Sequence, residues 1–192
     1  RIGGIEEERL EAVTEPIIGM EEPFFYRNKA QYPVGVNKDG NPVMGFYAGH
    51  SHNIIDCTDC AIQEPVNAVI LPVIKRFMQE NNISAYNEET GKGLLRHIYV
   101  RRGAVSGQIL VCLVINGRTI PRPEELIRRL QTIPGFTTLV LSVNTKKGNA
   151  VLGDKFITLH GPGYIEDTLC GLTFRLSPRS FYQVNHHQAQ RL

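Results

Sequence analysis

Apolar residues recur every three or four positions between residues 62 and 82, and this spacing predicts an amphipathic helix. The apolar stripe of this helix consists of Val66, Val69, Ile70, Val73, Ile74 and Phe77. Pro65 fits the first turn, and Pro72 is expected to bend the helix by removing one backbone hydrogen bond. A second helix is predicted over residues 122–132, where acidic residues come first and arginines last, an order that suits the helix dipole.

The other apolar segments are short and typical of strands. Residues 24–48 predict a hairpin, because Asp39-Gly40 supplies the positive φ that a tight turn needs. Residues 108–115 are almost continuously apolar, which predicts a strand buried on both faces. Further strands are expected over residues 94–102, 137–144, 156–160, 164–170 and 174–177. This pattern favours an α+β fold, with a mostly antiparallel or mixed sheet of several hairpins and two main helices on one face.

The composition is that of an ordinary globular protein, with 42% hydrophobic and 21% charged residues among 192. The formal net charge of +2 allows a nucleic-acid partner without arguing for one. Because the sequence shows no apolar run of about 18 residues and no signal peptide, we expect no membrane span and a cytoplasmic protein. Four cysteines in this length do not make a disulfide scaffold.

Two histidines and two cysteines lie within eleven residues, at His50, His52, Cys57 and Cys60. They invite a zinc interpretation, although a single Cys-x-x-Cys with no second pair is poor support for it. A redox Cys-x-x-Cys is the alternative, since such a motif usually opens a helix after a buried strand. A thiol or metal protein built on Cys57 and Cys60 therefore remains one hypothesis.

The segment 174–185 changes from strand to helix, because Pro178 ends the strand and helix-compatible residues follow Asn185. Phe181 and Gln183 lie at this junction. An exposed aromatic ring beside an amide can stack on a nucleic-acid base and bind its edge. The alternative interpretation makes Phe181 a core residue and Gln183 a turn residue.

Residues 177–185, Ser-Pro-Arg-Ser-Phe-Tyr-Gln-Val-Asn, together with Gln188 resemble the signature F-S-P-x-x-F-x-Q-V-N-x-x-Q. That signature belongs to the S-adenosylmethionine-dependent RNA uracil-5 methyltransferases. In this family it joins a central domain to the catalytic domain. The resemblance implies an enzyme that methylates C5 of a uridine, with residues 23–178 as the central, RNA-contacting domain. Residues 179–192 would begin the catalytic domain, and residues 1–22 would be a linker or arm.

The resemblance also implies roles for individual residues. Phe181 would pack against an extruded uracil, and Gln183 would bond the base edge or the methyl donor. Cys60, in an Ile-x-Asp-x-x-x-Cys pattern, matches the fourth ligand of an iron–sulfur cluster. The other three ligands are absent from this sequence, so Cys60 is expected to be a free thiol here. The nucleophilic cysteine of the family matches none of the four cysteines, so this fragment is predicted to be inactive alone.

Three basic residues are candidate RNA contacts, because arginine and lysine form charge-assisted bonds to phosphate. They are Arg27, Lys29 and Arg96. For the first two, a solvated strand face is the alternative. Cys60 matches a cluster ligand of the family, and this match favours large-subunit ribosomal RNA as the substrate. We also expect a monomer. A stand-alone nucleic-acid-binding module is the competing hypothesis.

Overall fold

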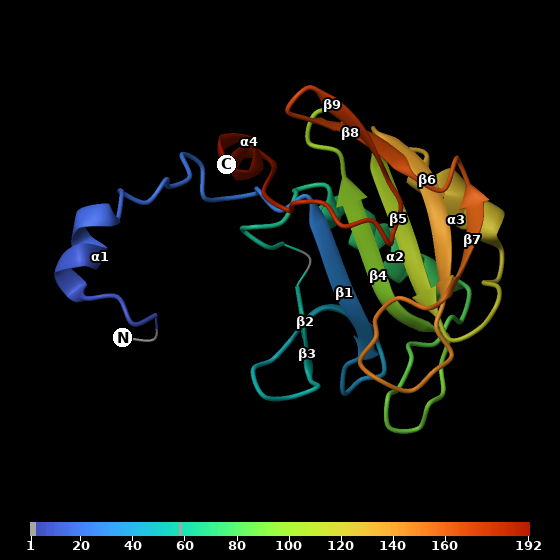
Figure 1. The fold of residues 1–192 in the computed structure, drawn as a ribbon. Helices are drawn as coiled ribbons and strands as arrows, with labels where there is room; N and C mark the ends of the chain where they lie inside the picture. The colour runs from blue at the N-terminus through green and yellow to red at the C-terminus, as the bar shows by residue number, and fades with distance from the viewer. Residues whose placement is uncertain (1–2, 58) are drawn as a thin grey trace.

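The computed structural model describes residues 3–57 and 59–192 (Figure 1). Helices and strands follow in the order α1 (Glu7–Val13), β1 (Lys29–Val36), β2 (Pro42–Tyr47), β3 (Ile54–Asp56), α2 (Asn67–Glu80), β4 (Leu95–Arg102), β5 (Ile109–Ile115), α3 (Pro123–Leu130), β6 (Phe136–Val143), β7 (Lys155–His160), β8 (Ile165–Leu169), β9 (Leu172–Leu176) and α4 (His186–Arg191). Among these, no helix is long and apolar enough to cross a lipid bilayer.

Seven strands form one sheet in the order β3-β2-β1-β4-β5-β6-β7. Neighbouring strands are antiparallel except β5 and β6, which are parallel and are connected through α3. Strands β8 and β9 pair only with each other, as a separate hairpin. The predicted α+β fold with a mixed sheet is confirmed.

The sheet is covered on both faces. Helices α2 and α3 lie behind it and bury the larger apolar cluster (Figure 1). The opposite face carries a smaller cluster, in which the β8–β9 hairpin and Tyr182 pack on Tyr99, Leu110 and Cys112. Strand β5 lies between the two clusters, so all seven of its residues are buried, as the continuous apolar run predicted.

Several elements differ from the prediction. Helix α2 begins only at Asn67, and Pro65 precedes it in a turn. The strands on either side of Gly161–Gly163 form as predicted but do not pair, because β7 joins β6 while β8 joins β9. Within the predicted arm, residues 7–13 form α1, which buries none of its side chains.

Strand β4 carries a bulge at its start, which interrupts the alternation of its side chains. The register of β4 against β5 shifts between Leu95 and His97, which leaves Arg96 in a bulge. Leu95 therefore faces the helices together with Ile98 and Val100. Beyond the bulge, His97, Tyr99 and Arg101 share the opposite face of the strand, because side chains alternate along it.

Candidate functional site

The segment 177–185 leaves β9 and crosses the ends of β4 and β1 before it enters α4 (Figure 1). It begins with a tight turn, in which the Ser180 N–H donates to the Ser177 carbonyl at 3.2 Å. The Ser177 N–H donates in return to the Ser180 hydroxyl at 3.0 Å. Pro178, buried in this turn, cannot continue the strand ladder.

A buried arginine holds this turn on the sheet. Arg101 is 1% exposed, and its guanidinium donates to the Ser180 carbonyl at 2.7 Å and to the Ser177 carbonyl at 3.4 Å. The guanidinium also lies over the Tyr99 ring, 5.6 Å from its centroid. Because the donor is charged and the surroundings are buried, these bonds are stronger than ordinary surface contacts.

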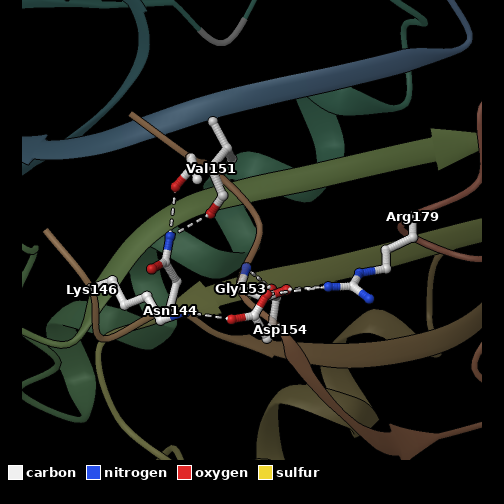
Figure 2. Close-up of polar contacts among 8 residues, drawn as sticks. Asn144, Lys146, Val151, Gly153, Asp154 and Arg179 are labelled. Atoms are coloured by element: carbon white, nitrogen blue, oxygen red, sulfur yellow. Dashed lines mark hydrogen bonds and ion pairs between the residues drawn. The ribbon is translucent and has the colours of Figure 1, made fainter. Parts of the chain in front are cut away.

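A second arginine fixes the turn from its outer side. The Arg179 guanidinium donates to the Gly153 carbonyl at 3.4 Å and to the Asp154 carboxylate at 3.5 Å (Figure 2). Asp154 also accepts from the Lys146 ammonium at 2.7 Å. The loop between β6 and β7 is itself closed by Asn144, whose amide donates to backbone carbonyls across the loop (Figure 2). The turn is thus tied to β4 and to this loop.

Tyr182, two positions after Ser180, points into the protein and packs in the smaller apolar cluster. Its hydroxyl donates to the Asp167 carboxylate at 3.2 Å, and the same carboxylate accepts three backbone N–H groups of residues 104–106. Burial and the nearby Asp167 carboxylate raise the pKa of Tyr182 to about 12. Tyr182 therefore stays a neutral donor, and it anchors the segment between two outward-facing neighbours.

Those neighbours are Phe181 and Gln183. The Phe181 side chain is 85% exposed, and Gln183 is exposed as well. The backbone beyond them is fixed, because Asn28 donates from its side chain to the Gln183 carbonyl and from its N–H to the Val184 carbonyl, both at 3.0 Å. The core interpretation of Phe181 was therefore wrong. A role for either residue in binding a base stays a prediction.

Helix α4 begins with a side-chain cap and receives the N-terminal arm. The Asn185 carboxamide oxygen accepts from the Gln188 N–H at 3.1 Å, as expected for a cap. The Gln188 amide donates to the Ile18 carbonyl at 2.8 Å, and Arg191 pairs with Glu21. The two segments that flank residues 23–178 thus lie side by side.

The candidate RNA contacts fall into two groups. Arg27 and Lys29 are half-buried at the start of β1, and neither forms an ion pair within the described chain. Lys29 lies directly across from Arg101, and burial, Arg101 and Arg27 lower the pKa of Lys29. These like charges favour a nearby anion.

Arg96 is placed differently. It is 4% exposed, and its guanidinium donates to the Asn144 and Lys146 carbonyls at 2.8 Å each. It also lies over the Tyr86 ring at 4.2 Å. An RNA contact through this guanidinium would require breaking bonds that hold the β6–β7 loop, so the structure gives Arg96 a structural role.

The cysteine and histidine side chains do not gather into a metal site. Within residues 3–57 and 59–192, no three His, Cys, Asp or Glu side chains are arranged to hold a metal ion. His52 instead pairs with Glu88 at 3.0 Å. A cluster needs four thiolates and Cys60 offers one, so these residues do not by themselves fit an iron–sulfur cluster.

The redox interpretation also lacks support from the structure. Cys60 lies seven positions before α2, so the pair does not open that helix. Burial, together with the nearby Cys60, raises the pKa of the Cys57 thiol, whereas a reactive Cys-x-x-Cys needs a lowered pKa. Asp56 is structural, because it accepts from the Met44 N–H and pairs with Lys75.

No family model matches the chain. An uncharacterized RNA methyltransferase of Clostridium acetobutylicum is 44% identical over 176 residues, which cover 91% of this chain and 38% of that protein. Another, from Halalkalibacterium halodurans, is 42% identical over 184 residues, covering 95% of this chain and 40% of that protein. The chain belongs to this family of RNA methyltransferases. It spans less than half the length of these relatives.

A solved structure carries the same fold as this RNA methyltransferase segment. The tRNA (uracil-54, C5)-methyltransferase of Pyrococcus abyssi, in complex with S-adenosyl-L-homocysteine, superimposes with a TM-score of 0.78 at 24% identity. The match covers 96% of this chain and 43% of that one. At this identity the match establishes the fold.

Sequence reasoning missed the residues that position the site. None of Arg101, Asp167 and Tyr182 was predicted to have a role at this site. Nothing local marks them, since their partners lie between 15 and 79 positions away. One sequence signal could have identified Arg101, namely a charged residue within a run of buried strand residues.

Proposed function

We propose that this chain is the central, RNA-contacting part of an enzyme that transfers a methyl group from S-adenosylmethionine to C5 of a uridine in RNA. Two similarities support the proposal. The relatives that match most of the chain are RNA methyltransferases, and the Pyrococcus protein of the same fold is named for uracil C5. The signature over residues 177–188 belongs to the same chemistry.

One observation carries the proposal: Phe181 and Gln183 are exposed on a backbone that is fixed on both sides. Leaving a phenylalanine 85% exposed forgoes the stabilisation that burial would give, about 1.5–3 kcal/mol. The surrounding anchors show that the exposure does not come from a loose loop. Stacking of a base on such a ring contributes about 1–3 kcal/mol.

The roles of the residues follow from this geometry. Phe181 stacks on the extruded uracil, and the Gln183 amide bonds the base edge or the methyl donor. Arg27 and Lys29 bind the phosphates next to that base. S-adenosylmethionine supplies the methyl group when bound.

The remaining machinery is assigned to other parts of the enzyme. Residues 23–178 form the central domain, residues 179–192 begin the catalytic domain, and residues 1–22 form the linker. The nucleophilic cysteine lies outside these residues, so the chain alone is inactive. We further propose a monomeric, cytoplasmic enzyme acting on large-subunit ribosomal RNA, with Cys60 as the fourth ligand of a cluster in the complete protein.

The test is transfer of labelled methyl from S-adenosylmethionine to RNA. The complete enzyme is expected to label C5 of a uridine in ribosomal RNA, while the 192-residue chain labels nothing. Labelling of transfer RNA alone would correct the substrate. No labelling of any RNA by the complete enzyme would favour a non-catalytic nucleic-acid-binding module.

A further inference from the structure

A cavity of about 250 Å³ lies at the opposite end of β1 and β4 from the segment 177–185. Gly35, Tyr47, His52, Tyr86, Glu88 and His97 are among its lining residues. His97 and Arg101 are four residues apart on β4 and share a face, which places them about 13 Å apart along the strand. The cavity therefore lies on the side of the sheet that carries the Phe181 segment.

His97 gives this cavity a polar group without a partner. The side chain is 8% exposed, and its Nδ1 has no hydrogen-bond partner in the described part of the chain. Burial, together with the nearby Arg96, lowers the pKa of His97 to about 4, so the imidazole is neutral and offers one donor and one acceptor. A buried polar atom without a partner is uncommon in native proteins, and a rotation of the imidazole ring would present this atom to a molecule in the cavity.

Glu88 determines the kind of ligand. Its carboxylate accepts from the Tyr47 hydroxyl at 3.3 Å and pairs with His52 at 3.0 Å, and each oxygen keeps a further lone pair. Glu89 lies beside it in the same lining. Two carboxylates repel a phosphate but accept N–H groups, so the ligand presents N–H donors here.

The walls suit a flat ring. Tyr47 is 42% exposed and meets the His52 ring edge-on, with centroids 5.8 Å apart. Tyr86, also in the lining, is buried and carries the Arg96 guanidinium 4.2 Å from the centroid of its ring. Bases stack on exposed aromatic rings irrespective of sequence, whereas hydrogen bonds to their edges distinguish them.

We propose that this cavity binds one unstacked guanine base of the RNA strand whose uridine reaches Phe181. Guanine carries two adjacent donors, N1–H and the N2 amine, which match the two oxygens of Glu88. Its O6 and N7 are acceptors and match the donor of the neutral His97 ring. The inference rests on the proposed RNA function and adds a base-specific contact at a second site.

The experiment uses four five-nucleotide RNAs, each a run of uracils with guanine, adenine, cytosine or uracil in the centre. Binding to the ¹⁵N-labelled 192-residue chain is followed by NMR. The guanine pentamer is expected to bind about tenfold more tightly than the all-uracil pentamer and to shift the amide signals of Gly35 and His97. All four pentamers are expected to shift the Phe181 amide.

Glu88→Gln keeps the size of the side chain but replaces one acceptor with a donor, so it should abolish the preference for guanine. Glu124→Gln, an exposed position in α3 on the other side of the sheet, makes the same charge change and should preserve the preference. Equal binding of all four pentamers by the wild type, or an unchanged preference in Glu88→Gln, would overturn the guanine site. In either case Phe181 would still respond, so the proposed function would stand. A chain that binds no pentamer would overturn both proposals.

Discussion

The guanidinium of Arg101 donates to the backbone carbonyl of Ser180 at 2.7 Å, across 79 positions of sequence. Ser180 immediately precedes Phe181, so a fully buried charge in β4 determines where the exposed aromatic ring begins. Asn28 performs the equivalent task on the far side, through the Gln183 and Val184 carbonyls. Between these anchors the segment has little freedom to move, which is the preorganisation that a base-binding site requires.

Replacing Arg101 by methionine should destabilise the fold by about 2–3 kcal/mol. The substitution preserves apolar bulk but leaves the Ser177 and Ser180 carbonyls without their charged donor. Urea denaturation of the chain measures the loss. Arg118→Met removes an exposed arginine and should change the unfolding free energy by less than about 0.5 kcal/mol. Equal stability of the two variants would show that the Arg101 bonds add nothing.

His97 predicts a pH dependence of stability. Its native pKa of about 4 lies below the unfolded value of 6.5, so the unfolded chain takes up a proton first as pH falls. The contribution of the neutral His97 to the free energy of unfolding is complete above pH 6.5. As pH falls from 6.5 to 4, this contribution is lost, and the free energy of unfolding decreases by about 3 kcal/mol. His97→Gln, which does not titrate, should lose this part of the slope, while His50→Gln at an exposed position keeps it. Identical slopes in the wild type and His97→Gln would refute the assignment.

The sequence predicted the strands and main helices well, because their signals are local. The continuous apolar run of β5 and the stripe of α2 follow directly from which faces are buried. The strand order and the separation of β8–β9 were not predictable in this way. They depend on pairings between distant segments. The alternation of apolar and polar residues along a strand is the same whichever neighbouring strand it pairs with.

The site was only partly predictable for the same reason. Phe181 and Gln183 stood out because a recognisable signature contains them. Arg96 was offered as a phosphate contact from its charge alone, yet the bulge at the start of β4 directs it to backbone carbonyls. Asp167 joins residues 104–106 to Tyr182, and no spacing rule links positions so far apart.

Cys60 leads to a prediction about metal content. Only one of the four thiolates that a cluster needs is available at this position, so the purified chain should contain no stoichiometric iron. Elemental analysis of the anaerobically purified chain measures this directly. Cys60→Ser should leave its melting temperature unchanged, because the thiol is half-exposed and free. Stoichiometric iron that is lost in Cys60→Ser would show that the chain holds a cluster by itself.

The central claim is that Phe181 and Gln183 face the reacting base, and single-turnover methylation by the complete enzyme tests it most directly. Phe181→Ala and Gln183→Ala should each slow methyl transfer by about ten- to a hundredfold, since each removes about 1–3 kcal/mol of interaction with the base or methyl donor. Both side chains are exposed, so the melting temperature should not change. Asn185→Ala removes a helix cap and should affect the rate less. Near wild-type rates for both Phe181→Ala and Gln183→Ala, with the fold intact, would contradict the account and leave the segment as a structural joint.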